Sequence, residues 1–250
     1  MYQLFSKRVS KPEMILFDVG GTLFDDSKCI PFDGLSALRQ RAENPDVTDD
    51  DTLTAIWDEY ISDVSGLKSH SGITLDFPLS AAIRYTAMKA GLRFSIPMAK
   101  QEEIFDRFNS SRKVIDGIPE LLDTIHSLGI RTAVISNNAM SGDGLALAIK
   151  RWIPNEKMEF FLTSADILLT KPCADIFGCA ANYAGISPDR CWYCGDGKTP
   201  DVYGAKGAGM TPVLLDTVSP LPSEIRTDEQ CGEYTAINRW DVLREYLLGL

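Results

Sequence analysis

Three acidic side chains stand where a strand-like apolar run gives way to a glycine-containing turn. Asp18 follows the run MILF and precedes the pair Gly20–Gly21. Asp196 follows the run CWYCG, and Asp201 comes five residues later. Glycines let a backbone or a ligand approach closely, and carboxylates placed in this way suit a nucleophile or the ligands of a hard cation such as Mg²⁺. These acids are therefore the first candidates for a reactive site.

Two further stretches offer groups that bind and neutralise an anion. The run TAVIS leads into two asparagines, so Ser136 and Asn137 present a hydroxyl and an amide. Lys171 precedes a proline and stands just ahead of a helical pattern that starts near residue 174. An ammonium group near a carboxylate offsets its charge, which favours the approach of a second anion. Together with a metal ion held by the acids, these residues offer the local help that an anionic substrate would need in a chain of net negative charge.

Five near-continuous apolar runs organise the chain around these residues. They cover 14–18, 132–136, 158–162, 191–195 and 211–215, and they alternate with helical patterns such as those at 120–128, 174–185 and 238–248. The alternation predicts an α/β fold with a doubly wound parallel sheet, both of whose faces are covered by helices. Ligands of such sheets bind at the carboxyl ends of the strands, so the polar side chains after the runs should converge on one site.

Residues 27–111 interrupt the alternation. Apolar stripes at helical spacing predict helices near 48–64, 78–90 and 97–109. An insert of this length exceeds an ordinary crossover between strands. We therefore predict two domains: an α/β core of residues 1–26 and 112–250, and an all-helical cap of residues 27–111 over the carboxyl edge of the sheet.

The composition narrows the range of partners. The chain has 250 residues, enough to bury a sizeable core, and a formal net charge of −10. A negative mean field repels the phosphates of nucleic acids and anionic membrane surfaces, and no apolar stretch reaches the roughly 18 residues of a membrane span. We expect no nucleic-acid partner, no membrane partner and a cytoplasmic location. The sequence leaves the oligomeric state open.

Six cysteines include Cys191 and Cys194, which are spaced like a disulfide or zinc motif. Both lie in a run that reads as a buried strand, where side chains three residues apart point to opposite faces. We therefore expect buried, reduced thiols rather than a disulfide or metal framework.

Taken as a set, the stretches FDVGGTL, VISNN, TKPCADIF and GDGKTPD resemble motifs I to IV of the haloacid dehalogenase (HAD) superfamily, which contains aspartate-nucleophile phosphatases and their relatives. The resemblance covers the whole predicted core. It implies a Rossmann-like HAD core with a helical cap between motifs I and II. It also implies Mg²⁺-dependent hydrolysis of a small phosphorylated metabolite through an aspartyl-phosphate intermediate.

The resemblance also implies roles for individual residues. Asp18 matches the nucleophile, and Ser136 matches the hydroxyl that holds the phosphoryl group. Lys171 matches the cation that neutralises the nucleophile and the phosphate. The implied ligands of Mg²⁺ are Asp18, the backbone carbonyl of Gly20 and Asp196, and Asp201 supports the metal site. The substrate-binding residues would be Gly21, Thr22 and Asn137.

The sequence departs from the family pattern at Gly20. Family phosphatases carry a second Asp there, which protonates the leaving oxygen and later activates water. A glycine keeps its carbonyl as a metal ligand but offers no proton. Loss of a positioned general acid costs about 10²- to 10⁴-fold in rate. Alkyl phosphates should suffer most, and acyl or aryl phosphates, whose leaving groups need little protonation, should suffer least.

Three accounts of the missing acid stay open. A phosphatase could take the proton from Asp25 or Asp26, from a cap carboxylate or from a bound water. Phosphonate-cleaving relatives have Ala at this position and use a cap lysine as a Schiff base, for which Lys68 is a candidate, whereas 2-haloacid dehalogenases have Tyr there and need no metal, which would leave Asp196 idle. The third account is a catalytically weak or inactive binding module on the same fold.

The histidines are His70 and His126, and neither has partners spaced for a zinc site. We expect His126 on the surface of its helix. His70 should lie in a loop of the cap, where it could contact substrate.

Overall fold

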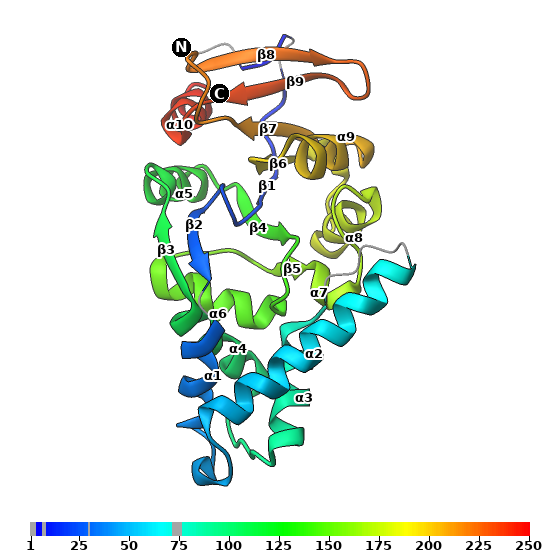
Figure 1. Cartoon of the computed structure of the whole chain (residues 1–250). Coiled ribbons are helices and arrows are strands. Elements are labelled where there is room, and N and C mark those ends of the chain that lie inside the picture. The colour runs from blue at the N-terminus through cyan, green and yellow to red at the C-terminus, as the bar shows by residue number, and fades with distance from the viewer. Residues whose placement is uncertain (1–3, 7–8, 30, 72–76) are drawn as a thin grey trace.

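A seven-stranded sheet forms the centre of the fold in the computed structural model, which describes residues 4–6, 9–29, 31–71 and 77–250. Its strands, in spatial order, are β5 (Phe161–Thr163), β4 (Arg131–Ser136), β1 (Met14–Phe17), β6 (Cys191–Gly195), β7 (Thr211–Leu215), β9 (Gly232–Ile237) and β8 (Ser223–Asp228) (Figure 1). Neighbouring strands are parallel except for β8 and β9. The predicted α/β class with a mostly parallel sheet is therefore confirmed.

The sheet is wider than the sequence analysis predicted. Its five predicted strands correspond to β1, β4, β5, β6 and β7, but β8 and β9 were missed. Strand β8, SEIRTD, is exposed or half-buried at every position, because an antiparallel edge strand needs only one apolar face. Strand β5 also starts later than predicted, at Phe161, although the backbone of Glu159 already bonds to Thr132 on β4 at 2.8 Å.

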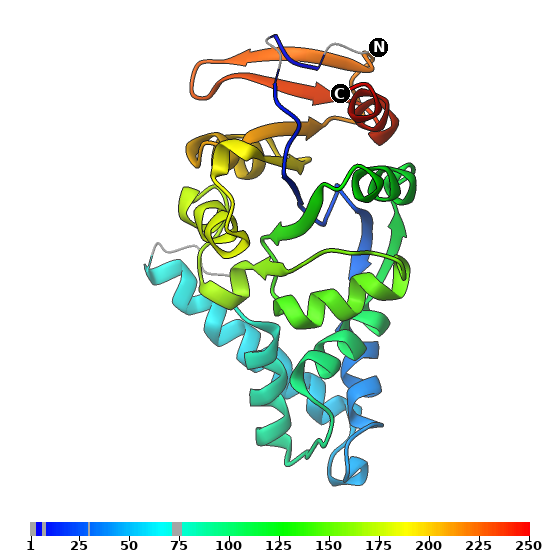
Figure 2. The same ribbon diagram turned by 180° about the vertical axis from the view of Figure 1, so that it is seen from behind.

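Alternate side chains of the central strands enter two separate hydrophobic cores. On β1, Ile15 and Phe17 face one core, and Met14 and Leu16 face the other. Helices α5 (Ile118–Ser127), α6 (Gly142–Trp152) and α10 (Trp240–Leu248) cover the first core, and α8 (Ala174–Ala184) and α9 (Gly204–Gly207) cover the second. Figures 1 and 2 show the two groups of helices on opposite sides of the sheet. The sheet is thus doubly wound, as predicted.

The thiols of Cys191 and Cys194 are free and lie on opposite faces of β6, as the strand pattern predicted. The expectation for His126 was wrong. Its ring is half-buried, with Nε2 3.0 Å from Oγ1 of Thr132, because the end of α5 packs against the start of β4. Burial, followed by the charge of Lys157, lowers the pKa of His126.

Four helices lie between the first and second halves of the core. They are α1 (Pro31–Arg39), α2 (Asp50–Ser71), α3 (Leu79–Ala90) and α4 (Met98–Asn109), with a 3₁₀ turn at Pro45–Val47. The last three match the predicted helices near 48–64, 78–90 and 97–109, and α1 was not predicted. Their apolar faces form a third core, in which the rings of Trp57 and Phe105 stack at 4.9 Å. In the part of the chain that the structure describes, no helix is both long and apolar enough to cross a membrane.

A two-stranded ribbon carries the chain into and out of these helices. Strand β2 (Phe24–Cys29) pairs antiparallel with β3 (Ser110–Val114). Asp26 pairs with Arg112, and Ser27 with Ser111. The predicted domain boundaries, at 26/27 and 111/112, fall between these two pairs, so the chain enters and leaves the helical insert side by side.

Helix α4 of the insert packs against α6 of the core through buried polar contacts. The Glu102 carboxylate, fully buried, accepts from the backbone N–H of Ser141 at 3.1 Å and from the Ser141 hydroxyl. Arg151 on α6 reaches Glu103 at 2.9 Å and Asp106 at 3.4 Å. An acid beside the first turn of a helix accepts hydrogen bonds from the unpaired N–H groups of that helix and interacts favourably with the helix dipole. Helix α4 therefore caps the start of α6.

Replacing Glu102 by Gln should make the free energy of unfolding less dependent on pH. Burial raises the pKa of Glu102, so the folded state holds this proton more tightly than the unfolded state, and stability falls as pH rises above the ordinary carboxyl range. The neutral amide lacks this titration. In urea unfolding, we expect the free energy of unfolding of Glu102→Gln to fall less than that of wild type between acidic and mildly alkaline pH. Glu245→Gln, an exposed match on α10, should follow wild type, and parallel curves for all three proteins would contradict the prediction.

Candidate active site

Asp18 and Asp196 leave neighbouring parallel strands at the same edge of the sheet. Phe17 on β1 is in register with Cys194 on β6, and the backbone N–H of Asp18 donates to the carbonyl of Cys194 at 2.9 Å. Asp201 joins them from a π-helical turn, η3 (Lys198–Tyr203). One carboxylate oxygen from each of the three acids lies within 4.8 Å of the other two. The structure therefore brings Asp18 together with Asp196 and Asp201, from which it is far apart in sequence.

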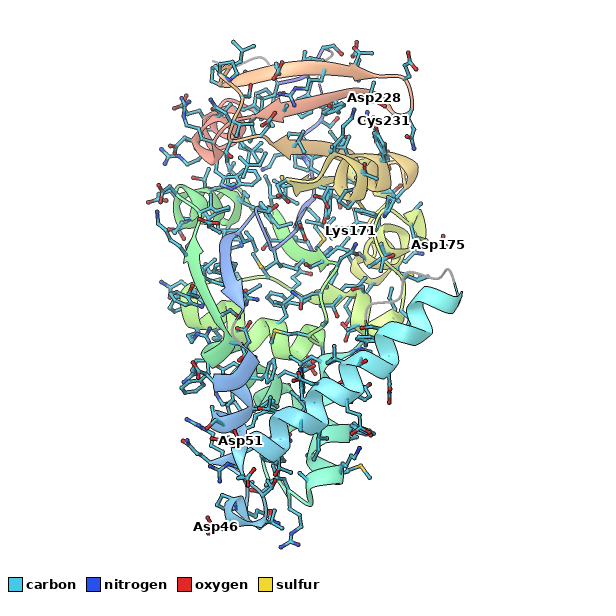
Figure 3. The ribbon with its side chains drawn as sticks, viewed as in Figure 1. Asp46, Asp51, Lys171, Asp175, Asp228 and Cys231 are labelled. Carbon is cyan, nitrogen blue, oxygen red and sulfur yellow. The ribbon has the colours of Figure 1, made fainter. Side chains whose placement is uncertain are left out.

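The ammonium group of Lys171 lies against two of these acids. Its Nζ is 2.8 Å from Oδ1 of Asp18 and 2.7 Å from Oδ1 of Asp201. The side chain is 2% exposed, and Figure 3 shows Lys171 among the side chains of the core. A buried ammonium persists only when it is paired and hydrogen-bonded. These contacts therefore fix the position of the cation beside Asp18.

Tyr193, which the sequence analysis did not single out, also contacts this ammonium. Its Oη lies 2.8 Å from Nζ of Lys171 and donates to the carbonyl of Ile135 at 2.8 Å. Burial, followed by the charges of Asp201 and Asp18, raises the pKa of Tyr193, so the phenol is neutral. In the sequence Tyr193 reads as one more apolar residue of CWYCG. The available signal was a tyrosine inside a buried strand, where its hydroxyl needs a partner.

The residues predicted at the end of β4 take different places. Ser136 ends the strand and is 3% exposed, at the same edge of the sheet as Asp18. The exposed Asn137 bonds to the backbone of Lys171 in both directions: Oδ1 accepts from its N–H at 2.7 Å, and Nδ2 donates to its carbonyl at 3.0 Å. This pair of bonds holds the Lys171 backbone beside β4. The Asn137 amide thus uses one N–H and one acceptor site on protein, and its predicted contact with substrate stays a prediction.

The turn after Asp18 is shaped by close contact with Asp196. Gly21 has φ +66°, and a Cβ there would meet Oδ2 of Asp196 at 2.0 Å. Only glycine fits, because any side chain would displace the carboxylate. Thr22, predicted to bind substrate, is fully buried, and its hydroxyl has no hydrogen-bond partner among the described residues. Its carbonyl accepts from Nε1 of Trp240 at 3.0 Å, so Thr22 faces the core.

The charges of the site suit a divalent cation. With all groups ionised, the three acids and Lys171 carry a net charge of −2. Desolvation by neighbouring groups, followed by the charges of Asp18 and Asp201, raises the pKa of Asp196 to about 6. Burial likewise raises the pKa of Asp201. Clustered hard oxygens with excess negative charge are the donor set that Mg²⁺ prefers. The residues present therefore fit the ion that the sequence analysis expected.

A cavity of about 440 Å³ opens beside this cluster. Gly21, Asp25 and Asp196 line it together with Asp216 and Thr217 from the end of β7. Asp25, one of the acids considered for proton transfer, is exposed and lines the same cavity as Asp196. The side chains of Asp26, Lys68 and His70 lie outside the described residues. The backbone of residue 70 belongs to α2, so the expected loop there is a helix.

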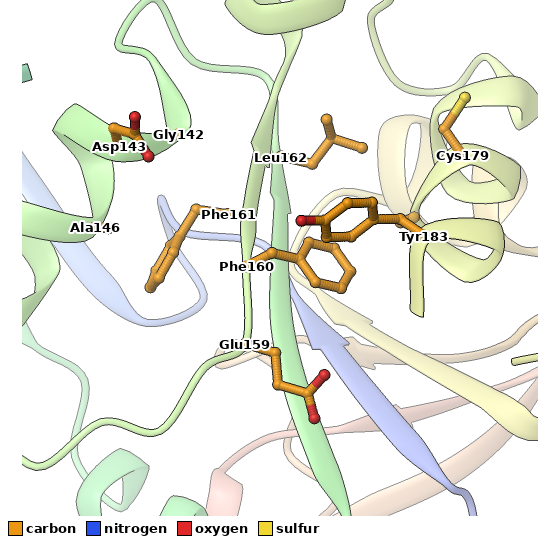
Figure 4. Close-up of a pocket in the computed structure, with 10 residues that line it drawn as sticks. Gly142, Asp143, Ala146, Glu159, Phe160, Phe161, Leu162, Cys179 and Tyr183 are labelled. Atoms are coloured by element: carbon orange, nitrogen blue, oxygen red, sulfur yellow. The ribbon is translucent and has the colours of Figure 1, made fainter. Parts of the chain in front are cut away.

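Another cavity, of about 540 Å³, lies over the edge strand β5, on the side of β4 that faces away from β1 (Figure 4). It is mainly apolar, with the rings of Phe160 and Tyr183 5.1 Å apart in an edge-to-face contact. Asp143 and Glu159 stand at its rim, and Glu159 is paired with Arg131 at 2.6 Å. None of the acids near Lys171 lines this cavity, so the candidate active site is the cluster at Asp18.

Without metal, Asp196→Asn should be more stable than wild type at about pH 8 but not at about pH 4. Because the pKa of Asp196 is raised to about 6, wild-type stability falls as pH rises from the ordinary carboxyl range through about 6. Solvent screening at this exposed group reduces the gain to about 1 kcal/mol, or about 2–4 °C in Tm. Thermal unfolding in EDTA measures it.

The matched control for this variant is Asp175→Asn, which removes an exposed charge on the outer side of α8 (Figure 3). It should show no gain that grows with pH. An Asp196→Asn protein with the wild-type pH dependence would contradict the electrostatic description of the acid cluster.

The fold is shared with solved structures of low sequence identity. A 2-haloacid dehalogenase from Pseudomonas syringae pv. Tomato DC3000 gives a TM-score of 0.58 at 18% identity, over 95% of this chain and 98% of that one. A HAD phosphatase from Thermococcus onnurineus gives 0.50 at 17%, over 94% and 97%. The HAD hydrolase YfnB from Bacillus subtilis, in a magnesium-bound form, gives 0.53 at 18%, over 96% and 100%. At these identities the likeness shows the fold alone.

The family follows from the sequence itself. No curated protein matches the chain. The family profile described as haloacid dehalogenase-like hydrolase matches residues 15–215, a span that contains Asp18, Ser136, Lys171 and Asp196. With the fold and the sequence profile in agreement, the chain belongs to the haloacid dehalogenase-like hydrolases.

Proposed function

We propose that the protein is a Mg²⁺-dependent phosphohydrolase that acts on a small phosphorylated metabolite, with Asp18 as the nucleophile. The observation that carries the proposal is the placement of Lys171 between Asp18 and Asp201, with Asp196 close enough to share an ion with them. A carboxylate repels the phosphate that it must attack. One ammonium and one divalent cation in a single cluster would remove that repulsion.

The acid cluster also favours phosphoryl transfer over dehalogenation. Displacement of a halide from carbon by a carboxylate brings no phosphate dianion into the site and needs no metal ion. Such chemistry leaves the charges of Asp196 and Asp201 without a role, although their pKa values are already raised by crowding. With a phosphate substrate and Mg²⁺, Asp196 would bind the metal ion and Asp201 would support its site. The structural relatives include dehalogenases as well as a HAD phosphatase, so the choice rests on the acid cluster.

In the proposed reaction, a carboxylate oxygen of Asp18 attacks phosphorus. The bond from phosphorus to the leaving oxygen breaks, that oxygen keeps the electron pair, and an aspartyl-phosphate forms. Water then attacks phosphorus, the bond from phosphorus to the Asp18 oxygen breaks with its electron pair on that oxygen, and the proton of the water leaves with the phosphate or to solvent, which restores the Asp18 carboxylate. Lys171 neutralises the nucleophile and the phosphoryl oxygens, and the Ser136 hydroxyl donates to the phosphoryl group. Mg²⁺, when bound, would be held by Asp18, the Gly20 carbonyl and Asp196, with Asp201 in support, and would supply positive charge.

Asp18→Asn should lower turnover of acetyl phosphate and p-nitrophenyl phosphate by at least about 10³-fold, because an amide is a poor nucleophile. Wild-type activity should require Mg²⁺ and disappear in EDTA. Thermal unfolding would establish that the variant is folded, and Asp175→Asn should retain wild-type rates. Chloride release from 2-chloropropionate without metal, combined with no phosphate release from either phosphate substrate, would overturn the proposal in favour of a dehalogenase.

Gly20→Asp should raise activity toward alkyl phosphates by about 10- to 100-fold, because it adds a side chain that can protonate the leaving oxygen. Acetyl phosphate, whose leaving group needs little protonation, serves as the internal control and should change little. The measurement is the ratio of kcat/KM for the two substrates in variant and wild type. An unchanged ratio would mean that a proton already reaches the leaving group by another route.

A further inference from the structure

The ammonium of Lys171 has three N–H donors, and three oxygens surround it. Two belong to carboxylates, Oδ1 of Asp18 at 2.8 Å and Oδ1 of Asp201 at 2.7 Å. The third is Oη of Tyr193 at 2.8 Å. An ammonium has no acceptor, so the Tyr193 oxygen accepts from Lys171. The hydroxyl of Tyr193 donates to the carbonyl of Ile135 at 2.8 Å, and Oδ1 of Asp201 lies farther away at 3.4 Å. The contact therefore has a fixed direction.

Tyr193 is itself held rigidly. It lies on β6 in register with Leu16 of β1, and its side chain crosses to reach the Ile135 carbonyl on β4. The ring is fully buried and meets Phe177 of α8 edge-to-face at 4.9 Å. A tyrosine fixed at both ring and hydroxyl presents its oxygen at one point in space. It can therefore fix the position of the Nζ atom at the flexible end of Lys171.

The other end of the same lysine is fixed as well. Asn137 accepts from the Lys171 N–H at 2.7 Å and donates to its carbonyl at 3.0 Å. With the backbone anchored, the freedom that is left belongs to the four-carbon side chain. Two carboxylates attract Nζ toward themselves, whereas Tyr193 is the neutral acceptor that holds it at a defined distance from both.

We propose that Tyr193 is a positioning residue, which holds Nζ of Lys171 where it neutralises Asp18 and a bound phosphoryl group. The inference rests on the proposed phosphohydrolase function and adds a residue to its site. Tyr193 itself touches no reacting atom. Without its hydroxyl the ammonium keeps its charge but settles toward the carboxylates, so attraction of the substrate persists while alignment for attack is lost.

Tyr193→Phe tests the proposal with p-nitrophenyl phosphate and Mg²⁺. We expect kcat to fall by roughly 10- to 100-fold, as for loss of a hydrogen bond to a charged group, and KM to change by less than about threefold. A structural role alone would lower Tm and leave kcat per folded molecule unchanged. Tyr234→Phe, which removes a hydroxyl from a buried tyrosine on β9, is the matched control and should keep the wild-type kcat. A wild-type kcat in Tyr193→Phe would overturn the proposal.

A double-mutant cycle separates this inference from the proposed function. The free energies of unfolding of Tyr193→Phe, Lys171→Met and the double variant need no activity. If Tyr193 holds Lys171, the double variant should be more stable than the two single effects predict, by at least about threefold in the folding equilibrium constant. Additive effects would overturn the positioning role even in an active phosphatase. Coupling in a protein that hydrolyses no phosphate would instead overturn only the proposed function.

Discussion

The buried contact of the Lys171 ammonium with Asp18 and Asp201 is the interaction on which the site depends. Desolvation offsets much of the attraction in such a contact, so it persists only where the remaining donors and acceptors are satisfied. The fold supplies these partners: Tyr193 takes the third N–H of Lys171, and the backbone N–H of Gly197 donates to Asp201 at 2.8 Å. One cation cannot balance three acids, however. The excess negative charge is what makes the cluster suited to a divalent ion.

The sheet explains how residues far apart in sequence reach this cluster. Parallel strands β1, β4 and β6 end at one edge, and each delivers a polar side chain there. Carboxylates can then approach one another only where the backbone has no side chains. A Cβ at Gly21 would meet Asp196 at 2.0 Å, and one at Gly195 would meet Asp201 at 2.3 Å. The glycines of motifs I and IV thus make room for acids, while Asn137 and Tyr193 set the position of the lysine.

The sequence predicts the parts of the molecule that have a strong local signal. Apolar runs followed by polar residues identify β1 and β6 and place Asp18 and Asp196 at one edge. Polar contacts made by a side chain that also packs in the hydrophobic core are not predicted in this way. Tyr193 reads as strand core, and only the folded chain brings its hydroxyl to Lys171. Thr22 matches a motif position, yet its side chain is fully buried, and the polar edge strand β8 lacks the apolar run by which the others were recognised.

The segment between β4 and α6 contacts both the site and the helical insert. At one end Asn137 holds the backbone of Lys171. At the other, Ser141 donates to the buried Glu102 of α4, and between them the carbonyl of Ala139 accepts from the N–H of Leu79 at the start of α3, at 2.6 Å. If α3 or α4 shifts relative to the sheet, these hydrogen bonds must either break or move residues 139 and 141 with the helices. Breaking them is costly at the buried Glu102, because a buried polar group is then left unpaired. Residues 137–141 therefore contact both the backbone of Lys171 and the helical insert.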